Sequence, residues 1–229
     1  MEDNVSNLRQ DSPLQGDKYV MEKTLGNGAE DDTILSVNDD KGEINGHEYV
    51  DLGLSVKWAT CNVGADSPTD YGNYYAWGET STKSEYTKKN SKTYGMIMID
   101  IAGDSTYDAA RANWGGSWRL PTKAEFEELI SNCNSEWTTL NGVKGRRFTS
   151  NMNGKSIFLP AAGYHEPKFF FTGRRYGSSY GAGKVGLYWS STPDESNADY
   201  AYYLWFRGSK QGVDCFTRYY GQSVRPVSD

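Results

Sequence analysis

The most reactive side chains in this chain are three cysteines, Cys61, Cys133 and Cys215. Cysteines at close and regular spacing would indicate a disulfide framework or a zinc site. Here the count is odd and the spacing is wide, so neither is indicated. The favoured interpretation is that the cysteines are small buried apolar residues. A Cys61–Cys133 disulfide is the alternative if the protein is exported.

Metal and acid–base chemistry have few candidates. Asp194, Glu195 and Asp199 carry oxygen ligands that could hold a cation, but a solvated loop is the favoured interpretation of this acidic group. The two histidines are interpreted as a strand surface residue, His47, and a loop residue, His165. We therefore expect no metal, no cofactor and no catalytic residues.

Binding chemistry is indicated more strongly, near the C-terminus. Aromatic residues there are mixed with Ser, Gly and isolated charges in 188–192, 201–206 and 221–227. A core would favour Leu, Ile and Val, whereas Tyr and Trp beside Ser and Gly are typical of a recognition surface. The sequence therefore predicts a binding face in the C-terminal third.

Strand alternation assigns side chains of this region to two faces. The side chains expected to point inward are Leu204, Phe206, Val213 and Cys215. Those expected to point outward are Trp205, Arg207, Asp214 and Phe216. An outward Trp, Arg and Phe on neighbouring strands is the residue mix of an interface anchor. The alternative is a bulge that shifts the alternation and puts Trp205 or Phe216 in the core.

Further candidates come from the same region, including a Gly-flanked loop that could line the same face. The full set of candidate ligand-binding residues is Tyr176, Ser178, Ser179, Tyr180, Asp194, Tyr200, Tyr202, Trp205, Arg207, Asp214, Phe216 and Tyr219.

Composition limits the class of protein and its partners. The 229 residues are 37% hydrophobic but 14% aromatic, which predicts a core built largely from Trp, Tyr and Phe. The net charge of −6 argues against nucleic acid or an anionic membrane as the main partner. No apolar run approaches the roughly 18 residues of a membrane helix. The start, residues 1–4, lacks the features of a signal peptide, which indicates either intracellular synthesis or a removed leader.

Residues 1–43 hold no Trp and many Asp, Glu, Asn and Gly, and are interpreted as a polar N-terminal arm or attachment segment. The compact domain is expected over 44–229. Short strands are predicted at 47–52, 56–60, 74–77, 147–150 and 156–160, with hairpin turns at Asn141–Gly142 and Asn153–Gly154.

One clear helix is predicted after Pro121, because Thr122 and Glu125 form a capping box. A shorter helix is predicted over 108–113. Many short strands with few helices and long connections favour an α+β class.

Five segments together resemble a known family. They are Tyr49–Leu54, Trp114–Phe126, Leu159–Tyr164, Tyr188–Thr192 and Ser223–Val227. Their order resembles C-type-lectin-like domains of the formylglycine-generating type, including a lectin-like paralogous group of gut bacteria. The resemblance covers about residue 45 to the end and implies a C-type-lectin-like fold. It also implies structural roles for Arg119, Arg225, Trp114, Trp118 and Trp189, which lie in its fold-defining segments.

The C-terminal layout also resembles the variable proteins of diversity-generating retroelements. In these proteins mutagenesis varies surface residues near the end of a lectin-like domain, and they act as phage receptor-binding proteins or surface-displayed binders. The resemblance implies a non-enzymatic binder of a protein or glycan on a cell surface, located outside the cell or on a phage particle. The alternative within the family is a constant cell-surface adhesin or carbohydrate-binding module.

Catalytic and calcium-binding relatives can be compared residue by residue. The formylglycine-generating enzymes need a cysteine pair near the C-terminus, where this chain has only Cys215, and the iron-dependent relatives need three histidines. The calcium site of true C-type lectins resembles Glu-Pro-Asn, and here Glu166-Pro167-Lys168 puts an ammonium where an oxygen ligand is required. An enzyme of this type is therefore the least favoured alternative.

Overall fold

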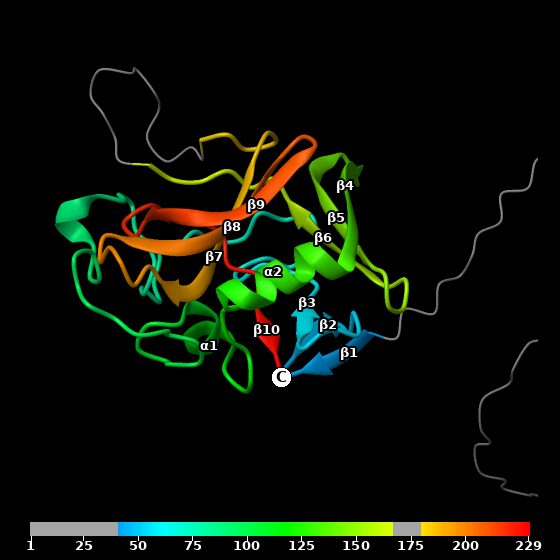
Figure 1. Cartoon of the computed structure of the whole chain (residues 1–229), viewed down its shortest axis with the longest axis horizontal. Helices are drawn as coiled ribbons and strands as arrows, with labels where there is room; N and C mark the ends of the chain where they lie inside the picture. The colour runs from blue at the N-terminus through cyan, green and yellow to red at the C-terminus, as the bar shows by residue number, and fades with distance from the viewer. Residues whose placement is uncertain (1–40, 167–179) are drawn as a thin grey trace, which may run out of the picture. The chain divides into compact units, whose positions relative to one another are not determined.

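The computed structural model describes residues 41–166 and 180–229, and it is mostly β-structure, with 38% strand and 11% helix. Its strands form three small antiparallel sheets arranged around one helix, α2 (Figure 1). This corrects the expected α+β class, and the arrangement does not support a C-type-lectin-like fold. The physical reason is that most segments between glycine turns are too short for a helix and are paired as hairpins instead.

The first sheet joins the two ends of the described chain. Its order is β1 (Lys41–Ile44), β2 (His47–Val50), β3 (Lys57–Ala59) and β10 (Val227–Ser228). The strands predicted at 47–52 and 56–60 are confirmed over 47–50 and 57–59. β1 begins before the expected domain start at residue 44, because Asn45 and Gly46 both have positive φ and form the tight turn to β2.

The second sheet consists of β4 (Cys133–Leu140), β5 (Val143–Ser150) and β6 (Ser156–Pro160). Asn141 and Gly142, with φ of 48° and 81°, make the two-residue turn between β4 and β5. Both predicted hairpins are thus confirmed, since 151–155 connect β5 to β6.

The helices are α1 (Ala109–Trp114), α2 (Lys123–Asn132) and the 3-10 turn η1 (Lys88–Asn90). The predicted capping box is present, because the Thr122 hydroxyl accepts from Glu125 N at 3.2 Å and Thr122 N donates to Glu125 Oε2 at 2.7 Å. Asp108 caps α1 by accepting from Ala110 N and Arg111 N. The strand predicted at 74–77 is wrong, since only Tyr75 forms a bridge there, with Gln222.

The third sheet carries the C-terminal region. It consists of β7 (Gly186–Pro193), β8 (Tyr200–Arg207) and β9 (Lys210–Thr217). The β8–β9 register runs without interruption from Tyr200↔Thr217 to Arg207↔Lys210, whereas β7 has an irregularity between Trp189 and Pro193. Residues directly opposite one another share a face of the sheet, so this register assigns every side chain of the hairpin.

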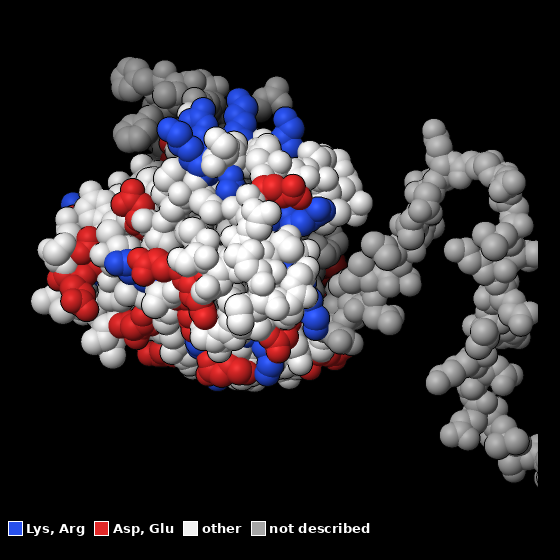
Figure 2. All heavy atoms as spheres, turned by 45° about the vertical axis from the view of Figure 1, so that its right-hand side comes forward, with Lys and Arg blue, Asp and Glu red and all other residues white. Residues whose placement is uncertain are grey.

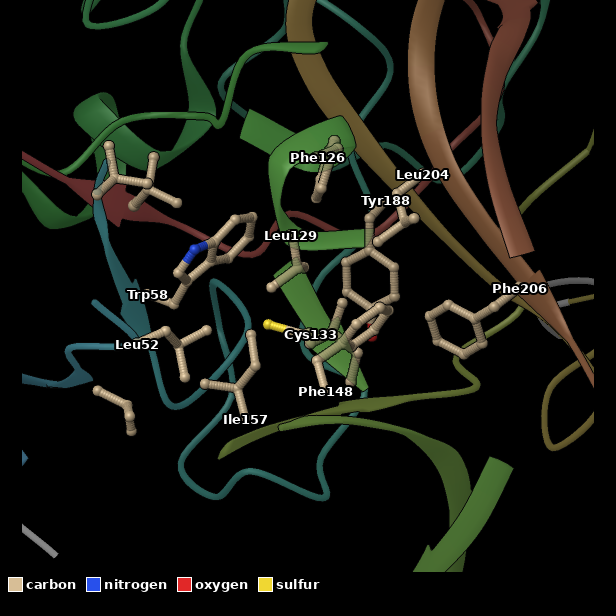
Figure 3. Close-up of a cluster of buried hydrophobic side chains, with 14 of the residues drawn as sticks. Leu52, Trp58, Phe126, Leu129, Cys133, Phe148, Ile157, Tyr188, Leu204 and Phe206 are labelled. Atoms are coloured by element: carbon tan, nitrogen blue, oxygen red, sulfur yellow. The ribbon is translucent and has the colours of Figure 1, made fainter. Parts of the chain in front are cut away.

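Both faces of the third sheet are packed. The face toward α2, which we call the inner face, presents Tyr188, Leu204 and Phe206 to Phe126 and Leu129 of the helix (Figure 3). The opposite, outer face contributes Leu187, Trp189, Ala201 and Tyr203 to a second cluster. Loop residues of that cluster include Tyr75, Trp77 and Trp118. Most of the largest fully buried side chains are Trp, Tyr or Phe, as the composition predicted, although Val, Leu and Ile are equally numerous among the buried residues.

This burial corrects part of the interpretation of the C-terminal aromatics as surface residues. Tyr188 and Trp189 are fully buried, and residues 221–228 are buried throughout. They are interior because 221–228 runs between β7 and the 74–77 segment and hydrogen-bonds to both, as Trp189 N does to Ser223 O. The structural roles expected for Trp114, Trp118 and Trp189 are confirmed by their burial.

The two arginines expected to be structural do hold loops together. Arg225 is fully buried and donates to the carbonyls of Ala59, Thr60 and Phe158 and to Asn62 Oδ1, at 2.8–3.1 Å. Arg119 pairs with both oxygens of Glu125, at 2.7 and 2.9 Å, and with the Asp229 side chain.

Candidate ligand-binding site

A pocket of about 570 Å³ lies on the outer face of the third sheet. It is lined by five aromatic rings, two cations and small or aliphatic residues. The lining residues are Tyr164, Tyr180, Gly181, Lys184, Val185, Leu187, Tyr203, Trp205, Arg207 and Phe216. The volume lies in the range of small-molecule and oligosaccharide sites.

Alternation along β8 and β9 puts the predicted outward residues on this face. Leu204 and Phe206 have no solvent exposure, whereas Trp205 is half-buried and Arg207 is exposed. Phe216 is half-buried on the same face. The alternative of a bulge in this hairpin is wrong because the β8–β9 register is uninterrupted.

A second wall of the pocket comes from Tyr164 and Tyr180. Their backbones exchange two hydrogen bonds, of 3.0 and 2.7 Å, and their rings meet edge to face at 5.3 Å. Gly163 makes this approach possible, since its φ is +71° and a Cβ there would lie 2.3 Å from Tyr180 O. Tyr164 also contacts Phe216, at a ring distance of 5.9 Å, so the two walls meet.

Asp214 and Tyr219 lie beside the pocket. Asp214 is exposed on the outer face, opposite Tyr203 in the register. Tyr219 stacks on Tyr220 at 5.0 Å and contacts Tyr94 at 5.3 Å. Because Tyr220 contacts Phe216 at 4.8 Å, the aromatic surface continues from the pocket to Tyr219.

Three of the candidate residues lie away from this pocket. Tyr200 and Tyr202 share the inner face with Leu204, because they lie four and two positions before it on β8. The Tyr202 ring lies under Lys123 Nζ at 4.2 Å. Asp194 lies near Tyr202, where the Ser196 hydroxyl and backbone N–H hold its carboxylate and lower its pKa.

Some predictions fall outside the described residues. These are most of the N-terminal arm, Pro167 and Lys168 of the segment compared with calcium lectins, and the candidate binding residues Tyr176, Ser178 and Ser179.

The sequence-based set also missed several lining residues. Tyr203 could have been found, since it alternates in phase with Trp205 and Arg207. Tyr164 and Lys184 carry no such signal, because only tertiary pairing brings their segments to the outer face.

The electrostatics of the pocket are positive. Lys184 and Arg207 are both exposed and form no ion pair with a described residue, and none of the described lining residues is Asp or Glu. Figure 2 shows Lys and Arg side chains gathered at the top of the molecule, the level of the β8–β9 and β4–β5 hairpin ends in Figure 1. Burial, followed by the nearby charge of Asp214, raises the pKa of Tyr203 to about 12, so its phenol stays protonated.

No family model, curated protein or solved structure matches this chain.

A second hollow, of about 370 Å³, includes His47, Glu48 and Cys61 among its lining residues. The His47 ring stacks on Trp114 with centroids 3.7 Å apart, and burial lowers the pKa of His47. No hydrogen bond joins His47 to Cys61 in the described part of the chain. A cysteine activated by histidine needs that contact, so the geometry does not support a nucleophile here.

The cysteines are free thiols, and Cys133 is buried in the inner cluster. Within residues 41–166 and 180–229, no three His, Cys, Asp or Glu side chains lie close enough together to hold a metal ion. In the same described ranges, no helix has the length and apolarity needed to cross a membrane.

Cys215 is expected to react slowly. Burial and a hydrogen bond with Asp194 raise the pKa of its thiol to about 11. At pH 8 only about 0.1% is then thiolate, against about a quarter of an unperturbed cysteine, so alkylation by iodoacetamide should be about 200-fold slower than for a cysteine in an unstructured peptide. The rate should rise about tenfold per pH unit up to pH 10. Site-resolved mass spectrometry measures the alkylation rate of Cys215. A rate at pH 8 equal to that of an unperturbed cysteine would contradict the raised pKa and make Cys215 a candidate nucleophile.

Proposed function

We propose that this protein is a non-enzymatic ligand-binding protein that uses the outer face of the β7–β8–β9 sheet. The observation that carries the proposal is the pocket itself, where aromatic rings and two cations that pair with no described residue converge on a hairpin of uninterrupted register. Its described lining includes no carboxylate, imidazole, thiol or hydroxymethyl side chain, which are the usual nucleophiles and general bases. Aromatic residues and arginine on a fixed scaffold favour binding.

We propose further that the ligand is a protein or glycan on a cell surface, met outside the cell or from a phage particle. The outer face is suited to variation, because Trp205, Arg207 and Asp214 point away from the packed inner face. A retroelement-diversified protein would vary these positions and retain Leu204 and Phe206.

Sister copies of the gene test this part of the proposal. We expect the copies to differ at the codons of the outer-face positions. We also expect a near-identical template repeat beside a reverse-transcriptase gene, with the differences between repeat and gene confined to adenines of the template. A complete genomic neighbourhood without such a repeat would leave a constant adhesin or carbohydrate-binding module.

Binding itself is tested with labelled protein on printed bacterial glycans and envelope proteins. Trp205→Ala should lower the signal for bound spots at least about tenfold, since a central aromatic anchor contributes 2 kcal/mol or more. Tyr202→Ala is the matched control, because it removes a half-buried ring from the same strand on the opposite face. EDTA should leave binding unchanged. Equal loss in both variants, or binding that survives Trp205→Ala, would place the ligand elsewhere.

A further inference from the structure

The indole of Trp205 is supported by the neighbouring strand. Gly212 is directly opposite Trp205 in the β8–β9 register, and a Cβ there would lie 3.2 Å from Trp205 Nε1 and 3.4 Å from Cε2. The ring therefore leans over Gly212 and occupies the space of the missing side chain. Its remaining surface faces the pocket, and its N–H makes no hydrogen bond with the described residues. Trp205 thus provides a stacking platform with a free donor.

Cations lie next to this platform. Arg207 is two residues along the same face of β8, about 7 Å from Trp205 by strand geometry. Lys184, just before β7, lines the same pocket. The cross-strand partner of Arg207 is Lys210, which is also exposed. These cations form a local positive field on a chain whose net charge is −6.

The acid on this face of the hairpin is farther from the cations. Asp214 lies opposite Tyr203, four pairs of the register away from Arg207, and does not line the pocket. Its charge weakens the positive field and does not cancel it. An anion that enters the pocket therefore finds donors at the Arg207 end that no described residue pairs.

We propose that the pocket binds an acidic sugar residue, whose apolar C–H face stacks on Trp205 while its carboxylate is held by Arg207 and Lys184. This inference rests on the proposed function and names its ligand class. A guanidinium donates two parallel hydrogen bonds to a carboxylate, and the adjacent ammonium adds a third donor. The indole N–H and the protonated Tyr203 phenol are donors for sugar hydroxyls. A pocket with one aromatic platform, cations at one end and neutral donors suits a saccharide better than an acidic peptide, which would need cations along its whole length.

The test measures affinities of the full chain for two matched pairs by calorimetry: trigalacturonate against its methyl ester, and sialyllactose against lactose. At least one acid should bind about tenfold or more tighter than its neutral partner, and rising salt should weaken the acid selectively. Arg207→Gln should lower acid affinity about 10- to 100-fold and remove the preference, because a charge-assisted hydrogen bond is lost. Asp214→Asn should raise acid affinity about two- to threefold.

Three further variants distinguish the effect of the pocket cations from the effects of stacking on Trp205 and of the protein's net charge. Trp205→Ala should weaken acid and neutral partner alike, by about 30-fold, whereas Trp205→Tyr should retain affinity to within about fivefold. Lys89→Gln removes one exposed positive charge outside the pocket and should change nothing. Thermal melting of each variant checks that it is folded.

Four outcomes overturn the inference. The first is equal affinity for the acid and its neutral partner, and the second is acid binding that survives Arg207→Gln. The third is that hexaglutamate binds, with a dependence on Arg207, while none of the sugars does. The fourth is that none of these probes binds. If the printed array still shows binding that depends on Trp205, the proposed function stands and only the ligand class is wrong. If the array also shows none, both fail.

Discussion

Replacing Arg225 with methionine is expected to lower the free energy of unfolding by at least about 4 kcal/mol, the larger of the two stability effects that we predict. Arg225 is fully buried, and it donates to three backbone carbonyls and to Asn62 Oδ1. These four acceptors stay buried when the guanidinium is removed. Each unsatisfied acceptor costs about 1–3 kcal/mol, so the apolar contacts of methionine cannot offset the loss.

Urea denaturation measures the effect, and Arg147→Met is the matched control. Arg147 pairs with Glu136 at 3.1 Å on the surface, where both side chains are more than a third exposed. Its replacement should change stability by less than about 1 kcal/mol. Arg225→Lys should be intermediate, because one ammonium cannot reach all the acceptors. An Arg225→Met protein as stable as the wild type would show that water or a local rearrangement satisfies the carbonyls.

The second large effect is a contrast between two neighbours on β8. Phe206→Ala should lower the free energy of unfolding by about 3–5 kcal/mol, because Phe206 is fully buried against Tyr188 and Trp137. Arg207→Ala should change it by less than about 0.5 kcal/mol, because the side chain is exposed and makes no ion pair with a described residue.

Comparing the two variants tests whether residues of the binding face can be replaced without unfolding the protein. Arg207→Ala should impair binding on the printed array while its melting temperature stays at that of the wild type. The reverse pattern, with a stable Phe206→Ala protein and an unfolded Arg207→Ala protein, would show that the faces of β8 have been assigned the wrong way round.

Separation of the two faces has a functional consequence. Inner-face residues such as Leu204 and Phe206 hold the sheet on α2, whereas Trp205 and Arg207 face the pocket from the same strand. A strand with this division tolerates substitutions at alternate positions. That property is what a surface under diversification would require, and it also allows a constant binder to change its ligand by few mutations.

Local sequence determined several elements of this protein. Thr122 and Glu125 specify the start of α2, and Asn141–Gly142 specifies the β4–β5 turn, because capping and positive φ are properties of a few adjacent residues. Alternation likewise identified the outward set of Trp205, Arg207, Asp214 and Phe216, since the period of a strand is two.

Only the tertiary structure decided the rest. The class is mostly β instead of α+β, because the pairing of short segments depends on partners far apart in sequence, as Val227 with Trp58. Tyr164 and Lys184 enter the pocket through contacts that no local pattern encodes. Tyr188 and Trp189 are buried because helix α2 covers one face of their sheet and loop residues cover the other. Composition shows that a chain is rich in tyrosine and tryptophan, but burial is a property of the assembled layers, so it alone separates the aromatic core from the aromatic binding face.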